Sequence, residues 1–335
     1  MRPVNHEPSS TPPSTSETSP ILILGLARSG TTWLGKIFDA HPDTSYRHEP
    51  DLPTALLGIP RILISGQPSQ WTHVLRDFVA GLPSLRRVRA SASLPVFPKR
   101  GEGFLHFQAR KAETWAVRLA SLRLGNFRLP EHCLGPDFAN RRLVWKSVWS
   151  VGRAAALLDA IPSIHIVLLL RHPCGVIYSR HRGVRAGVMA PVLHDEFSEL
   201  LGFRHHEFAG LDFSPSASAD RLELEAYRWA CLNSKAMKEI EGNDRCCWIR
   251  YEDLCRDPEA TVRAIFDRVQ LAWNPRVARF LKRSTSRDTR RFYSVYRKGE
   301  SLDAWKVEMS ANERKRVERI VANSEAGRLY FGGRG

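Results

Sequence analysis

The chain has 335 residues, of which 43% are hydrophobic, and 50 basic against 35 acidic residues give it a net charge of +15. This surplus favours an anionic partner such as a nucleic acid, a membrane surface, a phosphorylated cofactor or an acidic polymer, although solubility alone could also account for it. The longest apolar runs fall far short of the ~20 residues of a transmembrane helix, so we expect no membrane-spanning segment.

The first 20 residues are rich in Ser, Thr and Pro and have no apolar core. They do not resemble a secretory signal, and we expect a flexible tail over residues 1–20. The six cysteines have no zinc-ligand spacing, and the adjacent pair Cys246 and Cys247 does not suit a disulfide framework. We therefore expect reduced, mostly packed cysteines in a cytoplasmic protein that holds no metal.

The run ILIL at residues 21–24 predicts a short buried strand. The segment TTWLGKIFDAHP, residues 31–42, follows it and places Trp33, Leu34 and Ile37 on one face of a helix that ends before the proline. The intervening loop therefore has the context of a phosphate-binding loop, between a strand and a helix.

The loop GLARSGT, residues 25–31, contains two glycines before a helix start. Backbone N–H groups and the helix dipole would surround an anion there, and Thr31 and Thr32 can add hydroxyl donors. An ordinary strand–helix turn is the alternative. Thr31 stands where an ATP- or GTP-binding loop has its lysine, whereas Arg28 can neutralise a phosphate without a metal.

The middle of the chain predicts a β-α-β unit. Residues 52–140 have no clear period, and we expect them to form helices and loops that cover one side of the sheet. Strands are predicted at 143–148 and 164–170, with a short helix at 154–161 between them. This arrangement implies a parallel sheet.

Arg171 stands at the end of the 164–170 strand, where ligands collect in open α/β sheets. Ser179 lies eight residues later on the following helix. The two side chains could hold a second phosphate; the alternatives are an arginine that caps the sheet edge and a serine that faces solvent.

The C-terminal part alternates irregular and regular segments. Residues 183–220 are irregular, and their histidines lack the spacing of a metal site. A helix is predicted at 221–240 and a strand at 246–250. Asp257 and Pro258 begin another helix, and SANE at 310–313 is a capping box.

Together these segments resemble the sulfotransferases that use 3′-phosphoadenosine 5′-phosphosulfate (PAPS). RSGTTWL, residues 28–34, matches the 5′-phosphosulfate loop of that family, and RHP at 171–173 followed by Ser179 matches its 3′-phosphate segment. RKG at 297–299, followed by Trp305 and Lys306, is similar to its C-terminal loop. IRYEDLCRDPEATVRAIFDRVQL, residues 249–271, is similar to a further family stretch, and all four occur in the family order.

The resemblance implies an α/β fold with a P-loop-type central parallel sheet flanked by helices, a three-layer sandwich. It implies a single domain over residues 21–332, in which segments 52–140 and 183–220 shape the acceptor pocket. The arginine of the loop is typical of the carbohydrate-directed branch, and WKSV at 145–148 and the spacing of Trp229 and Asn233 favour the same branch. The resemblance therefore implies sulfuryl transfer to a hydroxyl or amine of a carbohydrate or glycolipid.

The resemblance also assigns the donor site. The amides of Ser29, Gly30, Thr31 and Thr32 would hold the 5′-phosphate, Arg28 would stabilise charge on the leaving phosphate, and Trp33 would stack on adenine unless it only packs in the core. The 3′-phosphate would be bound by Arg171, Ser179, Arg297, Lys298 and Gly299. The family needs no magnesium for transfer.

A general base is expected in YRHEPDLP, residues 46–53, just beyond the first helix. Some glycan-directed members of the family have a carboxylate or histidine at about this place, and we expect Glu49 to be the base. His48 is the alternative; in a strand the two side chains would point to opposite faces. Lys146 is the next candidate for stabilising charge.

Three other functions remain open at this point. A nucleotide-kinase type of phosphotransferase would bind Mg-ATP, but the loop lysine is missing. A non-catalytic nucleic-acid binder is supported only by charge, since no nucleic-acid module is recognisable. A sulfotransferase-like protein without activity is the third. We therefore expect a small-molecule or glycan acceptor and no nucleic acid, and leave the oligomeric state open.

Overall fold

A computed structural model describes residues 19–52, 56, 58–63, 70–125, 127–135, 138–189, 219–286, 295 and 302–332. All but the last two residues of the expected tail therefore lie outside the described residues, as do residues 190–218 of the irregular segment. In the described part of the chain, no helix has the length and apolarity needed to cross a membrane.

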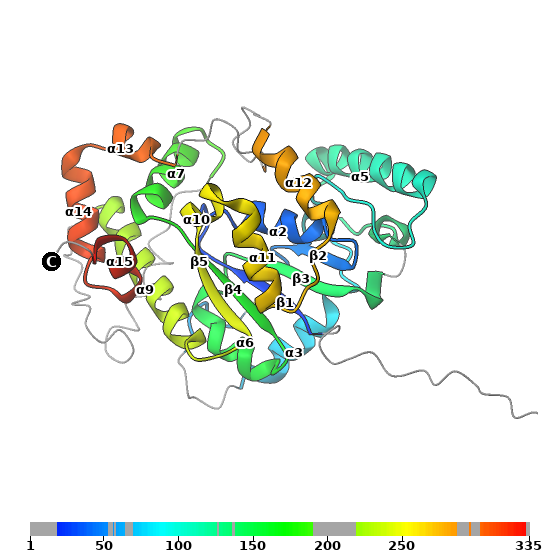
Figure 1. The fold of residues 1–335 in the computed structure, drawn as a ribbon, viewed down its shortest axis with the longest axis horizontal. Coiled ribbons are helices and arrows are strands. Elements are labelled where there is room, and N and C mark those ends of the chain that lie inside the picture. The colour runs from blue at the N-terminus through cyan, green and yellow to red at the C-terminus, as the bar shows by residue number, and fades with distance from the viewer. Residues whose placement is uncertain are drawn as a thin grey trace, which may run out of the picture.

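A five-stranded sheet with the order β2-β3-β1-β4-β5 forms the centre of the molecule (Figure 1). Every neighbouring pair of its strands is parallel. The strands are β1 (Ile21–Leu24), β2 (Thr44–His48), β3 (Arg142–Ser147), β4 (His165–Leu170) and β5 (Cys246–Arg250). The predicted parallel sheet and the strands expected at 21–24, 143–148, 164–170 and 246–250 are confirmed to within one residue.

The central strands are apolar throughout because helices cover both faces of the sheet. All residues of β1 are buried, and they alternate between two cores. Leu22 and Leu24 belong to one core, and Ile21 and Ile23 to the other. A continuous apolar run is the expected pattern for a parallel strand that is buried on both sides.

The helices form two layers around the sheet (Figure 1). The core that contains Ile21 and Ile23 is completed by α2 (Thr31–Asp39), α10 (Tyr251–Arg256), α11 (Pro258–Arg268) and α12 (Pro275–Ser286). The opposite core is completed by α3 (Thr72–Gly81), α6 (Ala154–Ala160), α7 (Pro173–Arg185), α9 (Arg221–Ile240), α14 (Ala311–Val321) and α15 (Glu325–Phe331). The predicted three-layer sandwich is therefore confirmed.

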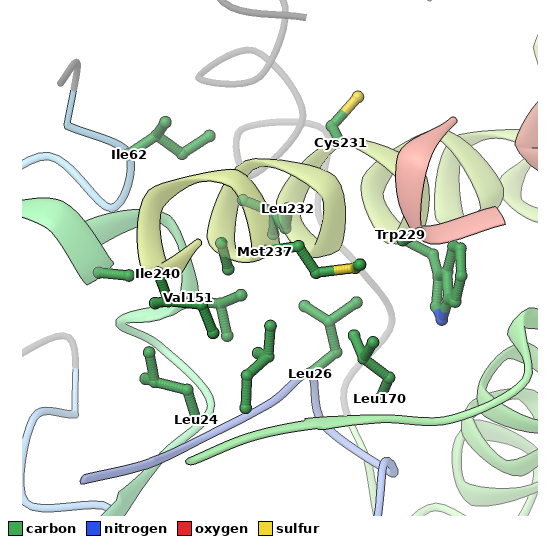
Figure 2. Packing of buried hydrophobic residues seen from close by; sticks show 14 of the residues in the cluster. Leu24, Leu26, Ile62, Val151, Leu170, Trp229, Cys231, Leu232, Met237 and Ile240 are labelled. Atoms are coloured by element: carbon green, nitrogen blue, oxygen red, sulfur yellow. The ribbon is translucent and has the colours of Figure 1, made fainter. Parts of the chain in front are cut away.

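Helix α9 carries the largest share of the second core. Figure 2 shows Leu232, Met237 and Ile240 of α9 facing Leu24 and Leu26 at the end of β1. Buried side chains of this size each contribute about 1.5–3 kcal/mol by leaving water. This packing holds the end of β1 in place, and the glycine-containing loop begins there.

Residues 52–140 do not all cover one side of the sheet, so that expectation is wrong in part. Helix α3 packs in the core under α6, but α4 (Val88–Ser91) contacts the edge strand β2. Helix α5 (Phe104–Leu124) lies beyond α4, at the opposite end of the molecule from α14 and α15 (Figure 1). A small separate cluster of Val88, Ala92, Leu129 and Cys133 connects these pieces.

The predicted helix caps are present. The Asp257 carboxylate accepts a hydrogen bond from the Ala260 N–H at 3.1 Å, and Ser310 and Glu313 form the reciprocal capping box. Helix α13 (Ala304–Glu308) precedes that box. All six cysteines are free and four are buried, which confirms the prediction of unpaired, mostly packed thiols.

Candidate functional site

The candidate site lies where β1 and β4 end side by side. In the sheet, the connection from β1 passes over β3 to the edge strand β2, whereas the connection from β4 goes in the other direction to β5. The connections therefore diverge between β1 and β4, and ligands of open α/β sheets bind at such a point. The loop at 25–30 follows β1, and Arg171 directly follows β4.

The glycines of the loop are required by close contacts. Gly30 has φ 95°, a left-handed conformation, and a Cβ there would lie 2.4 Å from the ring of Tyr251. A Cβ on Gly25 would lie 2.6 Å from the carbonyl oxygen of Leu169. Arg28 adopts φ 78° without being glycine, a conformation that costs a non-glycine residue about 1–2 kcal/mol. The loop is therefore held in a strained shape by its neighbours.

Several hydrogen-bond donors lie together where the loop meets the start of α2. The Ser29 N–H donates to the Leu26 carbonyl at 3.0 Å, but Thr31 and Thr32 belong to the first helical turn, whose amides have no intrahelical acceptor. The Ser29 hydroxyl is fully buried and has no hydrogen-bond partner in the described structure. An orphaned buried hydroxyl beside open amides fits an anionic ligand.

The two anion sites expected from the sequence are in direct contact. The Arg28 Nε donates to the Ser179 hydroxyl at 2.9 Å, and an Arg171 Nη donates to the Arg28 carbonyl at 2.9 Å. These residues are as many as 151 positions apart in the chain. The structure therefore brings the loop, the strand-end arginine and the helical serine together into one cationic site.

Tyr251 and Glu252 complete this site, although neither was among the expected site residues. The guanidinium of Arg171 lies 4.7 Å from the centre of the buried Tyr251 ring, which also packs edge-on against Trp33. Glu252 accepts a hydrogen bond from the His172 N–H at 3.0 Å. The sequence signal was the YED of the stretch at 249–271, which resembles the family but had no role assigned.

The C-terminal segment reaches the same corner. Arg297, Lys298 and Gly299 lie outside the described residues, but Trp305 stacks on His172, with ring centres 4.2 Å apart and planes at 15°. Burial lowers the pKa of His172 to about 4, and Lys306 acts in the same direction. A neutral imidazole therefore stacks on the indole at neutral pH.

Trp33 is a core residue in this structure. Its side chain has no exposed surface, and its indole N–H donates to the Ser284 hydroxyl at 3.0 Å. Adenine could stack on this ring only if neighbouring side chains moved. The adenine contact stays a prediction, and the packing role is visible.

The candidate bases lie at the end of β2, around Lys146. His48 is opposite Lys146 in the β2–β3 register, so their side chains share a face of the sheet. Glu49 has φ 46°, its N–H donates to the Lys146 carbonyl at 3.0 Å, and its carboxylate forms an ion pair with the Lys146 ammonium. Strand β2 ends at His48, so Glu49 lies outside the strand and the alternation expected within a strand does not apply to this pair.

Charge in this cluster favours the ionised carboxylate and the neutral imidazole. Burial raises the pKa of Glu49, but the Lys146 ammonium, through its charge and its hydrogen bond, outweighs burial and brings that pKa to about 2. Burial, assisted by Lys146, lowers the pKa of His48 to about 3. The Tyr46 hydroxyl lies 3.1 Å from the His48 Nδ1. At neutral pH both groups hold the unprotonated form that a base needs, but both are weak bases.

Asp51 supports the same corner and was not expected. It is buried and accepts hydrogen bonds from the hydroxyls of Ser147 and Ser150, and burial raises its pKa. These bonds tie the end of β3 to the chain that follows Glu49. The carboxylate therefore positions the segment that carries the candidate base.

Comparisons with known proteins gave one family match and several similar structures. A family model described as "Sulfotransferase family" matches residues 20–275. A sulfotransferase structure from Alicyclobacillus acidocaldarius is similar at 16% identity and TM-score 0.43, covering 94% of this chain and 96% of that chain. The mouse sulfotransferase SULT7A1 complexed with PAP is similar at 13% identity and TM-score 0.45, covering 93% and 87%.

A third similar structure is sulfotransferase STF9 from Mycobacterium avium, at 17% identity and TM-score 0.39, covering 87% of this chain and 75% of that chain. These scores are too low to indicate a shared substrate, and no curated protein matches the chain significantly. The assignment of a family therefore rests on the family model.

Proposed function

This chain belongs to the sulfotransferase family, and we propose that it transfers a sulfuryl group from PAPS to a hydroxyl or amine of a carbohydrate or glycolipid. One observation carries the choice of PAPS: Arg28 bonds both to Ser179 and, through its carbonyl, to Arg171. A loop that suits a 5′-phosphate and a corner that suits a second phosphate thus form one site. A nucleotide with phosphates on both sides of its ribose fits this arrangement.

The residues present fit this donor. We assign the 5′-phosphate to the Ser29 hydroxyl and to the amides of Gly30, Thr31 and Thr32, at the positive end of α2. We assign the 3′-phosphate to the Arg171 guanidinium and the Ser179 hydroxyl. Further candidates from the sequence are Arg297, Lys298 and Gly299. PAPS supplies the sulfuryl group itself, attached to a phosphate that leaves.

Arg28 supplies positive charge to the bound phosphate, a role that lysine and magnesium have in an NTP-binding loop. Its guanidinium already donates to Ser179, so it lies between the two proposed phosphate positions. A fixed cation at the leaving group stabilises the transition state without reorganisation, and a single such donor is typically worth about 10²–10³ in rate. Thr31 in the lysine position therefore argues against the kinase alternative.

Glu49 is the proposed general base, and Lys146 sets its strength. With Lys146 in contact, the pKa of Glu49 is about 2, too low for efficient proton abstraction at neutral pH. If the Lys146 ammonium turned to an anionic donor, burial would raise the pKa of Glu49 towards the range of a useful base. His48, neutral and adjacent, is the second candidate.

The acceptor class is supported by the loop arginine more than by the other sequence features. Trp229 does not lie at an acceptor surface: it is buried and its indole N–H donates to the Arg171 carbonyl at 3.0 Å. Trp229 therefore supports Arg171 in the proposed donor site. We propose a carbohydrate or glycolipid acceptor that contacts segments 52–140 and 183–220.

Thermal shifts with three ligands test the donor assignment. The chain should be stabilised by 3′-phosphoadenosine 5′-phosphate (PAP) and not by Mg-ATP or DNA. Ser179→Ala should weaken PAP binding more than 5′-AMP binding, since only PAP has the 3′-phosphate, while both lose the hydroxyl that holds Arg28. Ser121→Ala, a serine on the distant helix α5, is the matched control. Stabilisation by Mg-ATP alone would favour a kinase and refute the proposal.

Transfer assays test the chemistry. Radiolabelled PAPS with a panel of sugars and glycolipids should yield a sulfated product, and Glu49→Gln should reduce turnover by about 10²–10⁴-fold while PAP still stabilises the variant. Normal turnover by Glu49→Gln would show that Glu49 is not the base and would favour His48. PAP binding without transfer to any acceptor would favour the inactive alternative.

A further inference from the structure

Helix α5, over Phe104–Leu124, presents its apolar side to solvent. Trp115 is 52% exposed, Leu119 70% and Leu122 80%, at a spacing that places them on one face of the helix. Leu105, near the start of the helix, is 82% exposed. Surface helices ordinarily bury such a face, and an exposed apolar patch of this kind marks an interaction surface.

The inner side of α5 combines polar contacts with an apolar one, in which Val117 packs against the small cluster of Val88, Ala92, Leu129 and Cys133. The Arg110 guanidinium forms two bonds with the Glu102 carboxylate, at 2.6 and 2.7 Å, and a third to the Phe97 carbonyl. The Thr114 hydroxyl donates to the Arg110 carbonyl, and the Cys133 thiol lies 3.6 Å from Glu113. Arg110 and Thr114 are the buried residues of the helix. The described contacts thus hold α5 by its Arg110, Thr114 and Val117 side and leave Trp115, Leu119 and Leu122 facing outward.

The charged residues of α5 that border the apolar face are all positive. Lys111 and Arg123 are exposed and Arg118 is half-buried, and each lies within four positions of Trp115, Leu119 or Leu122. Glu113 is the single acidic residue in the α5 sequence, and its contact with Cys133 places it towards the inner side. Arg87 and Arg128, which form a bridge beneath α5, add exposed cations at the same end of the molecule.

We propose that this outward face of α5 docks on a lipid surface that carries anionic headgroups. An apolar stripe with a tryptophan and a basic border is the pattern of a helix that lies in the membrane interface. The same charges disfavour a second copy of this chain, because a two-fold pairing of α5 helices would bring basic borders together with no acidic residue on the stripe to neutralise them. The inference does not depend on the proposed donor or acceptor.

Vesicle flotation of the full chain tests the proposal. The protein should float with vesicles of phosphatidylcholine mixed with phosphatidylglycerol, float less with phosphatidylcholine alone, and be released by salt. The triple variant Lys111→Ala, Arg118→Ala, Arg123→Ala should bind on the order of 100-fold more weakly, since each basic residue near an anionic surface contributes about five-fold.

A double substitution of apolar by acidic residues provides the second part of the flotation experiment. Leu119→Glu with Leu122→Glu should abolish flotation, whereas Val307→Glu, at an 87% exposed valine of α13, should leave it unchanged. Far-ultraviolet circular dichroism and thermal unfolding verify that each variant is folded. Flotation that survives the Leu119 and Leu122 changes, or no flotation by the unmodified chain, would overturn the proposal. A dimer in sedimentation analysis that these two changes dissociate would also overturn it, in favour of a second copy.

Discussion

Replacing Lys146 by methionine should destabilise the protein at neutral pH and reverse the pH dependence that Glu49 contributes. The pKa of Glu49 is about 2 in the folded chain, against an ordinary value of 4.5. This gap of about 2.5 units corresponds to roughly 3 kcal/mol of stability. Because the folded value is the lower one, this contribution is complete above about pH 4.5 and is lost as the pH falls towards 2.

Without Lys146 the largest remaining influence on the Glu49 carboxyl is burial, which raises its pKa above 4.5. The ionised carboxylate then opposes folding, so stability should fall as the pH rises from 4.5 through the new value. Breaking a buried ion pair by removing one partner typically costs about 3–5 kcal/mol. The Glu49 side chain is 15% exposed and that of Lys146 3%, so solvent screens this pair weakly.

Urea unfolding at a series of pH values measures the effect. We would compare the unmodified chain, Lys146→Met, Glu49→Gln and the double variant, so that the cycle isolates the coupling between the two side chains. Arg256→Met is the control, since Arg256 is 65% exposed in its pair with Asp253, and should cost less than about 1 kcal/mol. Parallel stability–pH curves for Lys146→Met and the unmodified chain would refute the reasoning.

Three further changes test the loop and the buried charges. Arg28→Gly should be about 1 kcal/mol more stable than Arg28→Ala, because only glycine relaxes φ 78°, while both weaken PAP binding about 10- to 100-fold by loss of a charged contact. Asp39→Asn should cost about 3–5 kcal/mol in urea unfolding, because it leaves the buried ammonium groups of Lys36 and Lys99 without their carboxylate. Tyr251→Leu should lower the affinity for PAP in calorimetry about 3- to 30-fold by removing the ring beneath Arg171.

Each of these changes has a matched control. Gln270→Gly, at φ 55° and far along the chain from the loop, should be more stable than Gln270→Ala without any change in PAP binding. Asp43→Asn breaks an exposed pair with Arg100 and should cost less than about 1 kcal/mol. Tyr251→Phe keeps the ring and should bind PAP almost normally. Equal losses for a test variant and its control would contradict the assigned role.

The sheet and the phosphate loop were predictable because their signals are local. ILIL at 21–24 and IVLLL at 166–170 are continuous apolar runs of strand length, the pattern of a strand that is buried on both faces. The helix over residues 221–240 begins and ends where its apolar period does. Gly25 and Gly30 are visible in the sequence, and the contacts with Leu169 and Tyr251 that require them are present in the fold.

The rest of the site depends on neighbours that are distant in the chain. Nothing in the sequence next to Glu49 indicates that Lys146 pairs with its carboxylate, because the pairing arises from the β2–β3 register. The positive φ of Glu49 likewise overrides the alternation that placed it opposite His48. Helix α5 escaped prediction because its large apolar residues are exposed and its two fully buried residues, Arg110 and Thr114, are polar, so the sequence lacks the apolar stripe of a core-facing helix.

The sheet order has a consequence for biosynthesis. Strand β1 leaves the ribosome first, yet its partners β3 and β4 begin at Arg142 and His165, about 120 to 140 residues later. At about 5–20 residues per second, translation leaves ILIL unpaired for roughly 6 to 30 s. Nascent chains that stop before Arg142 therefore display an apolar strand with both edges open, and such intermediates should be the ones that aggregate or recruit chaperones during expression.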